Sequence, residues 1–344
     1  MIRGHGDDAY RYKNIIRADF SSNVCYGPLD SGLLAHLQNS IASVTHYPDA
    51  GAEGLQHVIA HRYGLEDEQV LVTNGATEAI YLIAQAYRGQ EVVIFTPAFA
   101  EYEDACRLHG LDVQLWLWDG LLTVPSIPAR LAFLCNPNNP TGAALPQETI
   151  RQLLQSNPHC TFVIDESYID FTLSTSSLLP ELSVYPNAIL LRSLTKNCRI
   201  PGLRIGWAIG TPALISAIRR GKMPWSVNQL AMEAALYIFQ HPDQFTIPLS
   251  RLLQHTADWQ KELQQVTGWQ GLPSSTHYFL LDTGGNYRVD QLKRWLIEWH
   301  GLLIRDASNF HGLTPGHFRL ACQEPAQNQL LTEALKECIH TGLS

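Results

Sequence analysis

The chain has 344 residues, of which 45% are hydrophobic and 16% are charged, so it can bury a large core and is long enough for about two domains. Its formal net charge of -8 argues against a basic nucleic-acid-binding surface, and we expect no nucleic-acid partner. The first residues lack the apolar core of a signal peptide, and no run of about 18 apolar residues could span a bilayer, so we expect a cytoplasmic protein without a membrane partner.

The opening residues, 1–45, are rich in turn formers and short of long periodic segments. They indicate an arm rather than a domain. An amphipathic helix follows, with Leu55, Val58, Ile59 and Arg62 at helical spacing.

From residue 69 to residue 209, short β-rich runs alternate with helical stretches. Strands are predicted at 69–73, 91–95, 112–116, 131–135, 161–164, 188–191 and 205–209, and helices at 78–87, 100–109 and 146–155. Residues 74–77 are predicted to form a tight turn. The alternation predicts the α/β class, with a mainly parallel sheet covered on both faces.

After Trp225 the pattern changes to an α+β one. Helices are predicted at 229–240 and 244–266, with Pro248 as a kink or a helix start, followed by strands at 275–281, 302–304 and 318–322 and helices at 290–299 and 326–339. We therefore expect three parts. These are an arm at 1–45 that contributes to the small domain and the active site, a large domain at 46–235 and a small C-terminal domain at 236–344.

The seven cysteines are scattered along the chain and never spaced as C-x-x-C. Their odd number and irregular spacing favour reduced, mostly structural thiols over a metal-binding or catalytic role. No metal site is predicted.

Polar residues directly after the strands are candidates for a ligand site, because ligands of parallel sheets usually lie beyond the carboxyl ends of the strands. Gly75, Ala76 and Thr77 follow the first strand and could offer backbone N–H groups to a phosphate, although a capped turn explains them equally well. Phe99 follows the second strand and could stack on a planar ring, although aromatic residues in such places more often belong to a core.

Two later strands end in residues suited to orienting a ligand. Asn139 lies in the loop 136–142, in which two prolines restrict the backbone and so allow a side chain to be aimed. Asp165 ends an apolar run, where a carboxylate is costly unless it is paired. A protonated heterocycle nitrogen and an arginine are both possible partners.

The stretch 193–204 places Lys196 among hydroxyl residues, with Arg204 beyond a Pro-Gly turn. An amine that can form an imine thus lies beside groups suited to an anion. Alone, the stretch also fits a solvated basic loop. Because it follows the strand at 188–191, it is expected at the same rim as Asp165.

Taken in order, residues 74–77, 136–142, 165–168 and 193–204 resemble the cofactor site of the pyridoxal-phosphate enzymes of the aspartate-aminotransferase fold, and the resemblance covers nearly the whole chain. It implies that Lys196 forms the internal aldimine with pyridoxal 5'-phosphate and later exchanges protons, and that Asp165 pairs with the pyridine nitrogen. Asn139 and Tyr168 would hydrogen-bond the phenolic oxygen, and Phe99 would stack on the ring.

The same resemblance assigns the cofactor phosphate to a group of backbone, hydroxyl and guanidinium donors. These are Ala76, Thr77, Ser193, Thr195 and Arg204, with Gly75 beside them and Tyr47 reaching across from a second subunit. It therefore also implies a homodimer with shared active sites.

Within this fold, the chain resembles two subgroups, the histidinol-phosphate aminotransferases and the threonine-phosphate decarboxylases of cobalamin biosynthesis. Several stretches look more like the decarboxylases: residues 5–6, 19–23, 97–102, 200–204, 223–228 and 303–310, of which 223–228 is the most telling. One departure concerns the arm. The family usually has a proline close after the position of Asn23, whereas residues 24–26 here precede Gly27 and Pro28.

Arg319 matches the family arginine that grips the anionic group of the substrate, for which a planar guanidinium is suited. We hypothesise that Arg319, Arg305, His5 and Asn23 hold a small phosphorylated amino acid, O-phospho-L-threonine. Its Cα–carboxylate bond, rather than its Cα–H bond, would then stand perpendicular to the ring, and (R)-1-aminopropan-2-yl phosphate and carbon dioxide would form.

Two alternatives remain at this stage. The first is a histidinol-phosphate aminotransferase or a related class I/II aminotransferase, which would share the whole cofactor site. The second is a regulatory domain that binds the cofactor without catalysis, against which the presence of both Lys196 and Asp165 argues.

Overall fold

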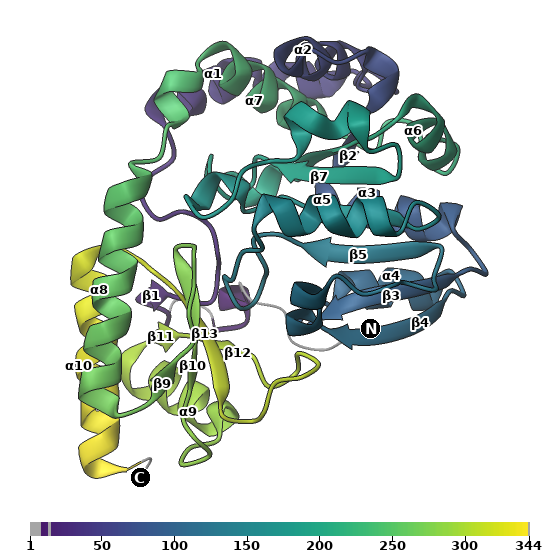
Figure 1. The fold of residues 1–344 in the computed structure, drawn as a ribbon. Coiled ribbons are helices and arrows are strands. Elements are labelled where there is room, and N and C mark those ends of the chain that lie inside the picture. The colour runs from purple at the N-terminus through teal and green to yellow at the C-terminus, as the bar shows by residue number, and fades with distance from the viewer. Residues whose placement is uncertain (1–7, 13–14, 343–344) are drawn as a thin grey trace.

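The computed structural model describes residues 8–12 and 15–342, and its largest element is a seven-stranded sheet (Figure 1). The strands of this sheet, in spatial order, are β2 (Val70–Asn74), β8 (Ile205–Ile209), β7 (Ala188–Ser193), β6 (Thr161–Asp165), β5 (Leu131–Cys135), β3 (Glu91–Thr96) and β4 (Asp112–Leu117). All neighbouring pairs are parallel except the two that β8 makes with β2 and β7. The predicted mainly parallel sheet is confirmed.

The direction of β8 has a consequence for the site. Because β8 alone runs against its neighbours, its first residue, Ile205, pairs with Asn74 at the end of β2, and Gly206 pairs with Ser193 at the end of β7. The start of β8 and the ends of the other strands therefore share one edge of the sheet, at which parallel sheets usually bind ligands.

Helices cover both faces of this sheet, as its alternating side chains require. Val70 and Val72 point to one face and pack with α1, α2, α5 and α7, whereas Leu71 between them points to the other face, which α3, α4 and α6 cover. The helices are α1 (Ser31–Ser40), α2 (Glu53–Tyr63), α3 (Gly75–Ala86), α4 (Glu101–Leu108), α5 (Gln147–Ser156), α6 (Pro212–Arg219) and α7 (Gln229–Gln240).

The C-terminal part has its own sheet and its own core. The strands, in spatial order, are β12 (Arg305–Asp306), β13 (His317–Ala321), β10 (Tyr278–Asp282) and β9 (Gln270–Gly271), and the helices are α8 (Leu249–Thr267), α9 (Val289–Trp295) and α10 (Pro325–Thr341). Helices α8 and α10 lie side by side in Figure 1 and contact each other. They pack on this sheet through a buried cluster that includes Trp259, Phe279 and Leu335.

The N-terminal residues join both parts. Strand β1 (Ala18–Asp19) pairs in parallel with β11 (Leu302–Leu303) of the C-terminal part. Helix α1 instead packs against α7 beside the large sheet. The segment between β1 and α1 therefore passes from one sheet to the other.

The structure corrects several predictions of local structure. Helix α1 was not predicted, because it buries only Leu33 and so shows no apolar stripe. The tight turn predicted at 74–77 is wrong: Gly75 is the first residue of α3. The predicted helix at 244–266 begins later, at Leu249, so Pro248 marks a helix start rather than a kink. Helix α6 and the short strands β1, β9 and β12 were also not predicted, since two to eight residues carry little periodicity.

None of the helices within residues 8–12 and 15–342 combines the length and the apolar character needed to cross a membrane.

Candidate active site

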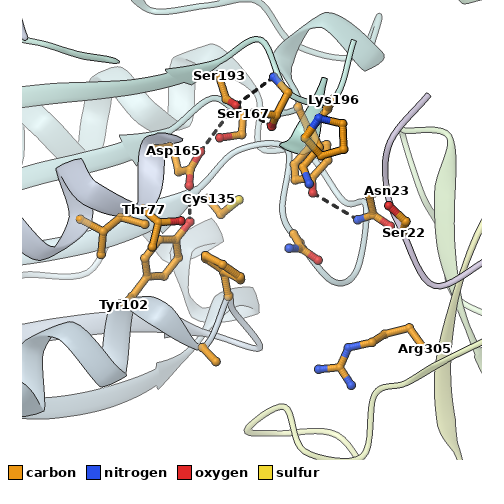
Figure 2. Close-up of a pocket in the computed structure, with 18 of the residues that line it drawn as sticks. Ser22, Asn23, Thr77, Tyr102, Cys135, Asp165, Ser167, Ser193, Lys196 and Arg305 are labelled. Carbon is orange, nitrogen blue, oxygen red and sulfur yellow. Dashed lines mark hydrogen bonds between the residues drawn. The ribbon is translucent and has the colours of Figure 1, made fainter. Parts of the chain in front are cut away.

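A cavity of about 400 Å³ lies at the edge of the large sheet where β5, β6 and β7 end and β8 begins. Residues from three parts of the chain line it: the N-terminal segment, the large sheet and the C-terminal strands (Figure 2). Most of the predicted site residues meet here. They are Asn23, Ala76, Thr77, Phe99, Asn139, Asp165, Tyr168, Ser193, Thr195, Lys196, Arg204, Arg305 and Arg319.

Three predicted site residues lie elsewhere. Gly75 is directly behind Ala76 at the first turn of α3 and does not itself line the cavity. Tyr47 is 85% exposed and packs against Trp225, with ring centroids 5.3 Å apart, away from the cavity of its own chain. His5 lies outside the described residues.

Asp165 is buried at the end of β6 and accepts two hydrogen bonds. The Tyr102 hydroxyl donates to Oδ2 at 2.6 Å, and the backbone N–H of Ser167 donates to Oδ1 at 2.9 Å (Figure 2). An arginine partner, which the sequence left open, is not what the structure shows, because Arg192 pairs with the neighbouring Glu166 at 3.1 Å. The carboxylate of Asp165 is thus oriented by neutral donors and lines the cavity, so it is available to a cationic ligand group.

Lys196 follows β7 in a loop whose first residues carry hydroxyl groups. The hydroxyls of Ser193 and Thr195 are 2.8 Å apart, and the backbone N–H of Thr195 donates to Ser193 Oγ at 3.2 Å. This local network fixes the two hydroxyls on the same side of the loop as the lysine, where all three line the cavity.

Arg204 directly precedes β8 and therefore lies at the same rim as the hydroxyl pair. It adopts a left-handed backbone conformation with φ +60°, and its Nη1 donates to the Pro201 carbonyl at 2.9 Å. Gly75 has φ +73°, and a Cβ there would lie 2.6 Å from Arg204 Nη2. Glycine at 75 thus allows the guanidinium to lie against the first turn of α3. Backbone N–H groups at a helix start and a guanidinium together suit a phosphate.

Asn139 and Tyr168 lie on the side of the cavity that faces the C-terminal strands. Arg319 Nη1 donates to Asn139 Oδ1, and Asn23 Nδ2 lies 3.4 Å from the Tyr168 hydroxyl. Burial raises the pKa of Tyr168 to about 12, while the nearby guanidinium of Arg319 acts in the opposite direction. Tyr168 is therefore a neutral hydrogen-bonding group at neutral pH.

Arg305 and Arg319 face each other across β12 and β13, where they form a registered pair. Both are buried, and burial lowers both pKa values; that of Arg305 falls to about 10, to which the charge of Arg319 also contributes. Arg319 Nη2 donates to the Ser21 carbonyl at 2.6 Å, and Arg305 Nη2 donates to Asn309 Oδ1 at 2.9 Å. Within the described part of the chain, neither guanidinium is ion-paired with a carboxylate.

Sequence reasoning missed two residues that organise this site. Tyr102 was predicted to matter only as part of the decarboxylase-like stretch 97–102, yet it is fully buried and donates to Asp165, which lies 63 positions further along the chain. His277 is fully buried, and its Nε2 donates at 3.0 Å to the carbonyl of Asn23, which lines the cavity. Each bonds to a residue far along the chain, so only the folded structure reveals its contacts.

The residues present fit pyridoxal phosphate. The guanidinium of Arg204 lies against the first turn of α3, where a Cβ on residue 75 would crowd it. Together with Ser193, Thr195 and Thr77, which line the same cavity, it suits a phosphate. Asp165, Phe99 and Lys196 line the same cavity. Their chemistry suits, respectively, the protonated ring nitrogen, the face of the ring and the carbonyl carbon of the cofactor.

Comparison with known proteins gives matches over most of the chain. The model of the family "Aminotransferase class I and II" matches residues 17–335. The threonine-phosphate decarboxylase of Salmonella typhimurium is 30% identical over 339 residues, which cover 95% of this chain and 92% of that protein. The histidinol-phosphate aminotransferase 2 of Pseudomonas fluorescens is 30% identical over 323 residues, which cover 89% and 84% of the two chains.

Among solved structures, the L-threonine-O-3-phosphate decarboxylase from Porphyromonas gingivalis superposes with a TM-score of 0.90 and 36% sequence identity. The superposition covers 94% of this chain and 99% of that one.

Proposed function

Since this chain belongs to the class I and II aminotransferase family, whose enzymes use pyridoxal phosphate, we propose that it decarboxylates O-phospho-L-threonine to (R)-1-aminopropan-2-yl phosphate and carbon dioxide, a step of cobalamin biosynthesis. The similarity to two threonine-phosphate decarboxylases, one of them at 36% identity with a TM-score of 0.90, supports this substrate.

The observation that carries the proposal is the buried pair of Arg305 and Arg319. Two guanidinium groups opposite each other, neither ion-paired with a carboxylate among the described residues, repel each other and are costly to bury. A substrate that brings a phosphate and a carboxylate would neutralise both. O-phospho-L-threonine carries these two groups on neighbouring carbon atoms, the carboxylate on Cα and the phosphate on Cβ.

When bound, pyridoxal phosphate supplies a conjugated, electron-withdrawing ring that accepts the electrons of a broken bond at the substrate Cα. The residues of this chain would orient the cofactor and the substrate and transfer a proton. Asp165 would keep the ring nitrogen protonated, and Arg319 and Arg305 would orient the anionic groups. After carbon dioxide leaves, Lys196 Nζ would deliver the proton that replaces the carboxylate on Cα.

A histidinol-phosphate aminotransferase is the second candidate, because a protein of that activity is also 30% identical over most of the chain. It would use the same residues to bind the cofactor. The two activities differ in which bond at Cα is broken, and the arginine pair would bind the phosphate of the substrate in either case.

A direct assay separates the two candidates. Purified protein loaded with pyridoxal phosphate is given O-phospho-L-threonine, and carbon dioxide and the phosphorylated amino alcohol are measured. The proposal expects both products in equal amounts, without a requirement for an oxo acid. Absence of carbon dioxide, together with amino transfer from histidinol phosphate to 2-oxoglutarate, would establish the aminotransferase instead.

We also propose a homodimer in which Tyr47 reaches the active site of the partner. The support is the position of Tyr47, which is exposed on the surface beside Trp225 rather than near the cavity of its own chain. Tyr47→Phe is expected to weaken cofactor retention while leaving the unfolding temperature and the dimer mass unchanged. A loss confined to stability would mean that Tyr47 is merely packed.

A further inference from the structure

Residues 20–28, which we call the arm segment, form one wall of the cavity through Ser21, Ser22 and Asn23. The inner end of this segment is fixed by backbone bonds to the C-terminal part. The N–H of Phe20 donates to the Leu303 carbonyl at 2.8 Å, and the Phe20 carbonyl accepts from Ala321 at 2.9 Å.

The outer end of the arm segment is attached to the loop that carries the lysine. The N–H of Cys25 donates to the Lys196 carbonyl at 3.0 Å. Three residues after the lysine, Arg199 reaches back with both terminal nitrogens: Nη1 donates to the Pro28 carbonyl at 3.1 Å, and Nη2 lies 3.9 Å from Cys25 Sγ. A single side chain thus contacts two points of the arm segment.

The two residues that meet at this contact, Arg199 and Gly27, both have a positive φ. Arg199 has φ +59°, a left-handed conformation that costs free energy in a residue with a side chain and persists only where its surroundings fix it. Gly27 has φ +112°, and a Cβ there would lie 3.2 Å from Arg199 Cζ. The guanidinium lies flat against a position that only glycine fills easily.

The backbone bond from Cys25 to the lysine loop depends on a residue other than proline at position 25. The family usually has a proline close after the position of Asn23, and a proline at position 25 would have no N–H to give to the Lys196 carbonyl. Cys25 supplies that N–H and buries its thiol against Tyr168, Phe171 and Leu252.

We propose that Arg199 is a positioning residue that holds the arm segment against the lysine loop and so keeps Asn23 at the substrate side of the cavity. Arg199 lies outside the cavity lining and acts through the arm segment. The effect on substrate rests on the proposed function, because that function assigns Asn23 to the substrate.

The thiol of Cys25 reports the position of the arm segment without any substrate. All seven cysteines are buried, so a thiol reagent such as 5,5'-dithiobis(2-nitrobenzoate) is expected to react slowly with the native protein. In Arg199→Ala, loss of the bonds to the arm segment should make one thiol react roughly tenfold faster or more. Adding Cys25→Ser should remove that fast phase.

Steady-state kinetics test the link to the substrate. Arg199→Ala should raise KM for O-phospho-L-threonine roughly tenfold while the visible absorption of bound cofactor is retained. Arg199→Lys, which keeps one donor for the Pro28 carbonyl, should lie between wild type and Arg199→Ala and serves if the alanine variant does not fold. Arg107→Ala, which removes an exposed ion pair with Glu103, is the matched control and should change neither readout.

The two readouts separate the possible failures. If Arg199→Ala shows no fast thiol, or if the fast phase survives Cys25→Ser, Arg199 does not hold the arm segment. A fast Cys25 thiol with an unchanged KM would overturn the link to substrate binding. If the protein instead prefers another substrate, the thiol result still stands and KM is measured with that substrate.

Discussion

The two sides of the cavity are built in different ways. On the side proposed to bind the cofactor (the cofactor side), the site residues lie within 74–204 at one edge of one sheet, and their contacts are often local, such as Ser193 with Thr195 or Ser167 with Asp165. On the side proposed to bind the substrate (the substrate side), which residues 21–23, Arg305 and Arg319 line, the contacts join the two ends of the chain: Arg319 bonds Ser21 across 298 positions. The cofactor side therefore depends on strand order, and the substrate side depends on how distant segments pack.

This difference predicts separate failures on the two sides. Changes on the cofactor side should alter the absorption of bound pyridoxal phosphate together with activity. Changes on the substrate side should alter KM or the stability of the arm segment and leave that absorption in place.

Lys196→Ala is expected to give the largest effect. Because, in the proposed function, it removes both the amine that bonds to the cofactor and the proton donor, activity should fall by at least about 10⁴-fold. The visible absorption band of bound cofactor should disappear, as recorded on the dialysed protein. Lys261→Ala, on the exposed face of α8, is the control and should match wild type. A variant that kept the band would place the covalent bond on another residue.

The contrast also explains how much the sequence could predict. The cofactor-side residues Asp165, Lys196 and Arg204 were predicted because each lies next to a strand that hydrophobic runs identify, and strand ends of a parallel sheet share an edge. For Arg305 and Arg319, the sequence carried only a family resemblance. It gave no sign that they pair across two strands, since β12 has two residues and no periodic pattern.

The contacts of His277 and Tyr102 could not be predicted from the sequence. Each is buried and bonds to a residue far along the chain, so no local spacing marks it. Their contacts arise from tertiary packing, which brings each of these buried residues next to a cavity residue far along the chain.

On the substrate side, Arg319→Lys should raise KM for O-phospho-L-threonine about 100-fold with the cofactor absorption retained. The planar, forked guanidinium of Arg319 can contact the Ser21 carbonyl, Asn139 and a substrate anion at once, and the ammonium group of a lysine cannot. Arg305→Lys should raise KM less, because among the described residues the Arg305 guanidinium contacts its own loop, at Asp306, Asn309 and Phe310. The exposed Arg288, changed to lysine, is the control. Equal effects of the two active-site variants would contradict this ranking.

His277, which bonds Asn23 on the substrate side, should make the stability of the protein depend on pH. Burial lowers its pKa from 6.5 to about 3, so between these values the unfolded chain binds a proton that the folded protein does not. Stability should therefore fall as the pH drops below 6.5, by about 1.4 kcal/mol per pH unit from this residue alone.

His277→Gln keeps a donor for the Asn23 carbonyl but has no such titration. Urea unfolding of both proteins at pH 7, 6 and 5 should show a shallower loss of stability in the variant, because groups such as the buried Glu166 titrate alike in both. Parallel pH profiles would mean that His277 is protonated in the folded protein.

Tyr102→Phe should give the smallest effect and tests the cofactor side again. The variant removes one of two hydrogen bonds to Asp165 and leaves the bond from the Ser167 N–H, so kcat should fall roughly tenfold or less. Tyr81→Phe is a matched control, because its hydroxyl donates to the carboxylate of Glu101 at 2.7 Å outside the cavity. If Tyr102 orients Asp165 toward the ring nitrogen, Tyr102→Phe alone should shift the absorption of bound cofactor. If both variants lost only stability, the Tyr102 bond would be a packing contact, and the cofactor side would depend on strand-end residues alone.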